Sequence, residues 1–255
     1  MSEIIPFSFP LNQGMHAFLR VRDSLRCLAE SQDAYAWLQA GADLRCSVLG
    51  EQGRHPAIPE VINLLVSTQE HLKKLAANHP EFAENIHFAC ENMDLQVQHL
   101  RDEQETIAKA LSEHSLLTRY SHSIQQYDWL GHKYLIPQGF HLLWQEMTEL
   151  HQPLMQLLEP LIITVKDLDI MLHDSVSWQQ ATASNGVDSI SPEHTPNLGL
   201  LVIGLSSEQV RAGVVPEVSG NRMAIRLNFH NWTAQGQPEL ITTDVSYQHM
   251  MVPIG

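Results

Sequence analysis

Two arginines near the C-terminus, Arg222 and Arg226, are spaced so that they can act together on one ligand. They lie in the run Ser-Gly-Asn-Arg-Met-Ala-Ile-Arg-Leu-Asn-Phe at residues 219–229, whose second part alternates polar and apolar residues. This alternation predicts a strand with both guanidinium groups on one face, about 13 Å apart. Guanidinium groups bind carboxylates through paired hydrogen bonds. The pattern therefore indicates a site for an acidic ligand, with ion pairs to the chain's own acids as the alternative.

The remaining reactive side chains form no catalytic or metal-binding pattern. The 15 histidines are scattered. His114 and His122 would lie about two turns apart on one helix, too far for one metal ion without a third element. Three aspartates between residues 167 and 174 lack the glycine and closing glutamate of a calcium loop, and no phosphate loop or nucleophile elbow occurs. We expect a binding protein without catalytic residues, cofactor or metal, and a histidine-based enzyme or metal protein is the alternative.

The composition narrows the possible partners. The chain has 255 residues, 44% of them hydrophobic, and a formal charge of −14 from 29 acidic and 15 basic residues. A charge this negative repels phosphate backbones and anionic lipids, so we expect no nucleic-acid or membrane partner. No apolar stretch reaches the roughly 18 residues of a membrane span, and the N-terminus does not resemble a signal peptide. The odd number of cysteines, 3, fits a cytoplasmic location.

The hydrophobic pattern changes near residue 180. Before it, apolar residues recur at helical spacing, and after it they alternate while Gly, Val and Thr become common. We predict helices over residues 11–30, 33–49, 59–77, 81–111, 115–130, 139–150 and 153–173. We predict strands over residues 3–9, 197–205, 214–218, 222–229 and 240–252, with turns at 219–221 and 236–238.

These elements predict an α+β fold, in which a mostly helical body carries a small antiparallel β-sheet domain formed mainly by the C-terminal third. A small sheet needs a second layer on one face to be stable. We expect the N-terminal strand, residues 1–9, to join the sheet. Residues 10–180 are then the helical domain and residues 181–255 the strand domain.

Two segments resemble a bacterial protein family. The opening run Phe-Ser-Phe-Pro-Leu-Asn-Gln-Gly-Met-His-Ala-Phe-Leu-Arg-Val, at residues 7–21, resembles the aromatic-x-x-Pro-Leu-Asn…Leu-Arg-hydrophobic opening of the ZapD family of cell-division proteins. The Ser-Gly-Asn-Arg-Met-Ala-Ile-Arg run looks like the family's Ser-Gly…Arg-aromatic-Ala-Ile-Arg strand. Between them, Leu-Ile-Pro-Gln-Gly at residues 135–139 resembles the family's Pro-Gly turn. The match is strong at both ends and loose in the middle.

The resemblance implies a cytoplasmic homodimer at the division site. Such a dimer would bind the C-terminal tail of FtsZ, the tubulin-like division protein, and bundle FtsZ filaments to stabilise the division ring. In the family a basic pocket receives this tail. Arg222 and Arg226 correspond to its strand arginines, and Arg54 and Arg119 to further basic positions. Arg20 belongs to the opening motif, where a structural role is the alternative.

The chain departs from the family pattern in its middle part. Residues 111–115, Leu-Ser-Glu-His-Ser, lack the basic side chains usual there, and Arg22 stands where an acid is usual. The missing basic side chains remove positive charge from the expected pocket. The alternative function is therefore a dimeric interaction protein of the same fold with a different or weakened partner specificity.

Overall fold

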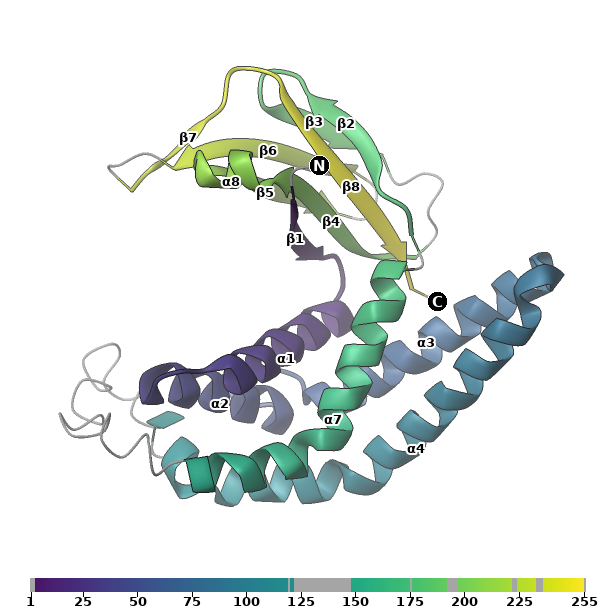
Figure 1. Cartoon of the computed structure of the whole chain (residues 1–255), viewed down its shortest axis with the longest axis vertical. Helices are drawn as coiled ribbons and strands as arrows, with labels where there is room; N and C mark the ends of the chain where they lie inside the picture. Colours follow the sequence, from purple (N-terminus) through teal and green to yellow (C-terminus); the bar gives the residue numbers. More distant parts are fainter. Residues whose placement is uncertain are drawn as a thin grey trace. The chain divides into compact units, whose positions relative to one another are not determined.

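A computed structural model describes residues 3–118, 120–121, 148–174, 176–191, 197–221, 224–232 and 236–254. It contains two compact units, shown in Figure 1. The β unit comprises Met1–Met15 and Ile170–Ile254, and the helical unit comprises His16–Asp169. The sequence placed these boundaries at residues 9–10 and 180–181. They differ because helix α1 (Gln13–Glu30) begins, and helix α7 (Thr148–Asp174) ends, within the β unit.

The helical unit is built on a pair of long helices that run side by side (Figure 1). Helix α3 (Ala57–Asn78) leads through the 3-10 turn η1 (Pro80–Phe82) into α4 (Ala83–Glu113), and α2 (Ala34–Leu49) contacts both long helices. The side chain of Asp33 accepts a hydrogen bond from the Ala36 N–H and so caps the start of α2. Gly50, with φ 69°, ends that helix in the left-handed conformation.

The core of this unit comes from apolar stripes along the helices. On α4 the buried residues recur at alternating spacings of four and three, which keeps them on one helix face. The same spacing on α7 buries one row of side chains, and burial of each leucine contributes about 2 kcal/mol. The stripe on α4 consists of Ile86, Cys90, Met93, Val97, Leu100, Ile107 and Leu111, and that on α7 of Leu154, Leu158, Leu161, Val165 and Leu168.

Polar contacts join α7 to the other helices of this unit. Arg22 Nη1 on α1 lies 2.9 Å from Asp169 Oδ1 on α7. Gln96 Nε2 on α4 donates to Asp167 Oδ2 at 2.6 Å. The unusual Arg22 therefore has an acidic partner on a neighbouring helix, and the carboxylates at 167 and 169 are used in helix packing.

The β unit is a sandwich of two antiparallel sheets. The first has the order β1-β4-β8-β2 and the second the order β3-β6-β5, with β7 also pairing with β6. The N-terminal strand joins the first sheet in the register Ile4↔Ser206 to Pro10↔Leu200. The strands are β1 (Ile4–Pro10), β2 (Gln179–Ala183), β3 (Val187–Ile190), β4 (Leu198–Ser206), β5 (Val214–Asn221), β6 (Ala224–Trp232), β7 (Pro238–Leu240) and β8 (Val245–Pro253), and the short helix α8 (Ser207–Arg211) follows β4.

The inner faces of the two sheets form one hydrophobic core. Phe229 on β6 packs against Tyr247 on β8, with ring centroids 5.2 Å apart. The buried cluster consists of Ala183, Ile190, Leu198, Leu201, Ile203, Leu205, Ile225, Leu227, Phe229, Val245 and Tyr247. The α+β fold class and the joining of the N-terminal strand to the sheet are therefore confirmed.

Several expectations for the strands were wrong in detail. Strands β2 and β3 were not predicted, and β2 begins at Gln179, inside the range assigned to helices. Residues 219–221 were predicted as a turn but belong to β5, where Asn221 pairs with Ala224. Gly220 permits this because its φ is 114° and an added Cβ would lie 2.2 Å from the Ala224 carbonyl oxygen. The predicted helices at 115–130 and 139–150 lie largely outside the described residues.

Candidate functional site

The predicted arginine strand corresponds to β6, which lies between β3 and β5 (Figure 1). Ile225, Leu227 and Phe229 are buried in the sandwich core, whereas Arg226 is exposed on the opposite face. The predicted alternation is therefore confirmed for these residues. Arg226 is paired in register with Ser189 of β3 and Ser219 of β5, so uncharged side chains flank it.

The guanidinium group of Arg226 is available to a ligand. Its Nε donates to Asn228 Oδ1 at 3.2 Å, a contact between neighbours on the same strand face. Among the described residues it forms no ion pair with a carboxylate. A guanidinium with free donors on an open polar face can bind a carboxylate through two hydrogen bonds.

The other predicted site residues fall into three groups. Arg54 is used within the helical unit, because its Nη1 lies 2.8 Å from Asp43 Oδ1 and donates to Ser47 Oγ at 2.9 Å. Arg20 is exposed on α1 and has no ion-pair partner in the described part of the chain. Arg119 and Arg222 lie outside the described residues. Internal pairing, the alternative considered for Arg222 and Arg226, is not found for Arg226 among the described residues, whereas Arg54 does pair internally.

The opening motif supports the fold. Phe7, Phe9 and Leu11 pack against the core of the β unit. The Asn12 side chain accepts a hydrogen bond from the Met15 N–H at 2.8 Å and so caps α1. The aromatic, Leu and Asn positions of the motif thus have structural roles, and its Arg20 is the exposed exception.

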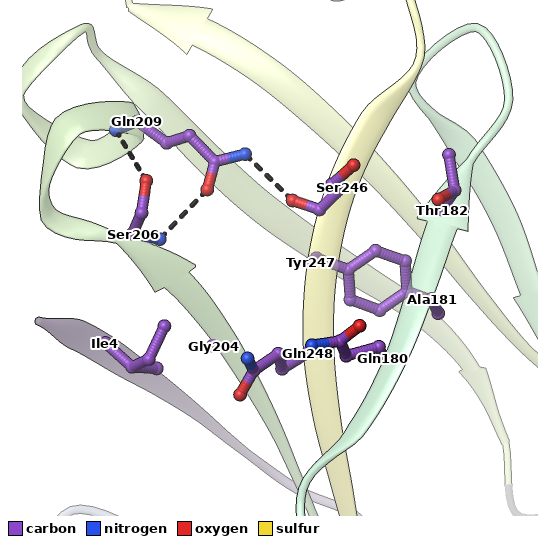
Figure 2. Close-up of a pocket in the computed structure, with 10 residues that line it drawn as sticks. All are labelled: Ile4, Gln180, Ala181, Thr182, Gly204, Ser206, Gln209, Ser246, Tyr247 and Gln248. Carbon is purple, nitrogen blue, oxygen red and sulfur yellow. Dashed lines mark hydrogen bonds between the residues drawn. The ribbon is translucent and has the colours of Figure 1, made fainter. Parts of the chain in front are cut away.

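A second candidate site is an open pocket of about 370 Å³ on the outer face of the first sheet, shown in Figure 2. Its floor includes Gly204 of β4, where an added Cβ would lie 2.8 Å from both Ile4 and Trp178. Gln209 of α8 forms one wall, since its side chain accepts from the Ser206 N–H and donates to the Ser246 carbonyl at 2.8 Å.

The free polar groups on the described lining residues of this pocket are uncharged. Gln180 of β2 and Gln248 of β8 are paired in register and lie next to each other in Figure 2. Thr182 and Ser246 form the next pair on the same face of these strands. Amides and hydroxyls can both donate and accept hydrogen bonds, so the pocket suits neutral polar groups, whereas an acidic tail would find no cation among the described lining residues. These residues also include no nucleophile with an adjacent base.

A polar cluster lies inside the sandwich. The Tyr247 hydroxyl on β8 donates to Asp188 Oδ2 on β3 at 2.7 Å. Burial raises the pKa of Tyr247, and the hydrogen bond to Asp188 raises it further. His249 is 8% exposed, and its Nδ1 has no hydrogen-bond partner among the described residues. Burial lowers the pKa of His249, and the nearby charge of Asp188 opposes this shift.

The buried His249 is expected to make the protein less stable in acid. Its folded pKa lies below the ordinary value of 6.5, so the unfolded chain binds the proton more tightly. This contribution to the free energy of unfolding is complete above pH 6.5 and is lost as the pH falls through the folded pKa. The pKa of His114 is lowered by burial in the same direction. Urea unfolding at pH 7.5, 6 and 5 measures this loss.

The variant His249→Gln should reduce the dependence of stability on pH. The matched control is His87→Gln, because the His87 side chain is 75% exposed. The control should keep the wild-type dependence. If His249→Gln also kept it, the acid lability would arise elsewhere.

Within the described ranges, no group of three or more His, Cys, Asp or Glu residues could hold a metal ion. No helix in the same ranges is long and apolar enough to cross a membrane. No protein-family model matches the chain, and no curated protein matches it closely enough to be a relative. The functional interpretation therefore depends on the two end motifs and on the chemistry of the exposed side chains.

Two exposed features were not predicted from the sequence. The pocket glutamines belong to β2, β8 and α8, and their proximity depends on strand pairing. Trp232, at the end of β6, is 53% exposed. The alternation that places Arg226 on the outer face also places Trp232 there, so extension of that pattern by three positions would have found it.

Proposed function

We propose that this protein is a cell-division accessory protein that binds the C-terminal tail of FtsZ and bundles FtsZ filaments. The observation that carries the proposal is Arg226, an exposed cation without a carboxylate partner among the described residues, on the strand that resembles the family's tail-binding strand. The protein acts by binding and not by catalysis. It works in the cytoplasm at the division site, where FtsZ assembles.

The charge balance makes unpaired arginines significant. The chain has about two acids for each base, so an arginine inside this protein readily finds a carboxylate. Arg22, Arg26, Arg45 and Arg54 are all in ion pairs. Arg226 has no carboxylate partner among the described residues, and neither do the exposed Arg20 and Arg101. A guanidinium without an internal partner keeps its donors for the carboxylates of a peptide tail.

Filament bundling requires two tail-binding sites in one particle, which a homodimer supplies. Each charge-assisted contact contributes about 1.5–3 kcal/mol, so two or three contacts give a micromolar site. When one tail is bound, the second site meets its tail at a high effective concentration. A dimer of weak sites can therefore cross-link filaments and still release them as the ring remodels.

The loss of Arg54 to an internal ion pair favours a second candidate function. With Asp43 as its partner, Arg54 adds little to a basic pocket. If too few cations remain to bind the FtsZ tail, we expect the protein to be a dimeric interaction protein of this fold with another partner. Dimerisation without affinity for the tail peptide would identify this case.

Co-sedimentation with FtsZ filaments from the same organism tests the main proposal. We expect the protein to pellet with filaments, to bundle them in electron micrographs, and to be released by excess tail peptide. Because surface charges are screened at distances beyond about 10 Å in 0.1 M salt, higher salt should weaken binding. FtsZ filaments without the tail are the control, and equal co-sedimentation with them would contradict the proposal.

A further inference from the structure

The outer face of β6 continues past Arg226 to an exposed apolar patch. Trp232 is 53% exposed and Leu240, on β7, is 47% exposed. Trp232 pairs in register with Pro238, and His230 pairs with Leu240. Opposed residues in an antiparallel pair share one face, so Trp232, Pro238 and Leu240 form a single patch, here termed the Trp232 patch. Alternation along β6 places this patch on the same face as Arg226.

The face between Arg226 and the Trp232 patch carries one acid, Glu217, whose side chain is 63% exposed and lies beside His230. Asn228 is neutral, and His230 Nε2 lies 2.7 Å from Glu217 Oε2 without the alignment of a hydrogen bond. Asp188 pairs with the inward-facing Leu227, and Glu239 pairs with Asn231, so neither acid lies on the face of Arg226. Glu217, which pairs with Asn228, is therefore the one acid on this face within the described strand residues. No acid therefore opposes Arg226 directly, and the face presents a cation at one end and an apolar patch at the other.

We infer that this face binds an extended acidic peptide that also carries a bulky apolar side chain. A carboxylate contacts Arg226, and the apolar side chain contacts the Trp232 patch. The two contacts lie six residues apart on β6, about 20 Å at the rise of a strand. The apolar group of the peptide therefore needs to lie about six positions from its acid. The inference rests on the proposed function, in which the bound peptide is the FtsZ tail.

Charge and exposure together favour this occupant. An arginine alone attracts any acid and gives a weak, salt-sensitive contact. Exposed tryptophan beside leucine is costly to leave in water, and tryptophan and arginine are the side chains that most often dominate protein interfaces. The Trp232 patch thus supplies a contact that salt does not screen, and the fixed separation from Arg226 selects among acidic peptides.

Anisotropy of a labelled FtsZ tail peptide measures the contribution of the patch. We expect Trp232→Ala and Leu240→Ser each to weaken binding about tenfold, with the salt dependence unchanged. The control is Phe88→Ala, since Phe88 is 66% exposed and lies in the helical unit. Its affinity should match that of the wild type. Unfolding curves of each variant confirm that the β unit is folded.

A synthetic peptide separates this inference from the proposed function. It carries an Asp-Asp pair, a Gly-Ser spacer of about six residues and a Phe, and its partner has a spacer of about two residues. If the wild type binds the long-spacer peptide more tightly than the short one but not the FtsZ tail, the proposed function fails and the inference holds. Wild-type affinity of Trp232→Ala for both the tail and the long-spacer peptide would overturn the inference. So would a change in sedimentation of Trp232→Ala without a change in peptide affinity, because the patch would then join two copies of this chain.

Discussion

Replacing Arg226 with glutamate is expected to abolish co-sedimentation with FtsZ filaments, whereas Arg101→Glu is expected to leave it unchanged. Both arginines are exposed, and both lack an ion-pair partner among the described residues. The two variants change the net charge equally. Only Arg226 lies on the strand proposed to bind the tail. Loss of its charge-assisted hydrogen bonds and repulsion of the tail carboxylates should weaken tail binding at least about tenfold.

The comparison of these two variants distinguishes a local contact from a general effect of charge. Long-range repulsion between an acidic protein and an acidic tail would weaken both variants alike. A local contact weakens Arg226→Glu alone. Adding Arg222→Glu to Arg226→Glu extends the test to the second strand arginine. If bundling survived in this folded double variant, the proposed tail site would be wrong.

Substitution of Gly186 by alanine is expected to destabilise the β unit by about 2–5 kcal/mol. Gly186 has φ 72°, and an added Cβ would lie 2.1 Å from the Ile241 carbonyl oxygen. Its own carbonyl accepts a hydrogen bond from the Phe229 N–H at 2.8 Å. Gly186 therefore connects the turn between β2 and β3 to β6 through Phe229, and packs that turn against Ile241 in the segment after β7. The backbone must shift to admit any side chain there.

Gly53 provides the matched control for this substitution. Its φ is 73°, nearly that of Gly186, but no atom lies within 4 Å of the position of an added Cβ. Gly53→Ala should therefore cost only the left-handed strain, about 1 kcal/mol. Urea unfolding of the wild type and both variants gives the two costs. If the two costs were equal, the close approach of Gly186 to Ile241 would not contribute to stability.

The elements that were predictable from the sequence are those specified by local chemistry. Asn12 and Asp33 each precede a helix and cap it, and Gly50 ends one. The apolar spacing on α4 and α7 matches a helical face. The alternation in β6 gave the correct inner and outer faces. In each case, a few neighbouring residues determine the conformation.

The features that were missed depend on residues distant in the sequence. Strand β2, Gln-Gln-Ala-Thr-Ala, has only the small Ala181 and Ala183 as an apolar face, and its pairing with β8 makes it a strand. The ion pair of Arg54 with Asp43 forms across a helix end and a loop, so spacing alone did not reveal it. The pocket on the first sheet likewise combines β1, β2, β4, β8 and α8.

The pairing of β1 with β4 sets an order of events during synthesis. Phe7 and Phe9 of β1 leave the ribosome well before residues 200–206, which are the partners of their strand. At about 5–20 residues per second, the strand waits some 10–40 s for them. The helical unit lies between the two, so all of it is synthesised before residues 200–206. It can pack while Phe7 and Phe9 still lack their partner strand, so we expect a chaperone to protect β1 during synthesis.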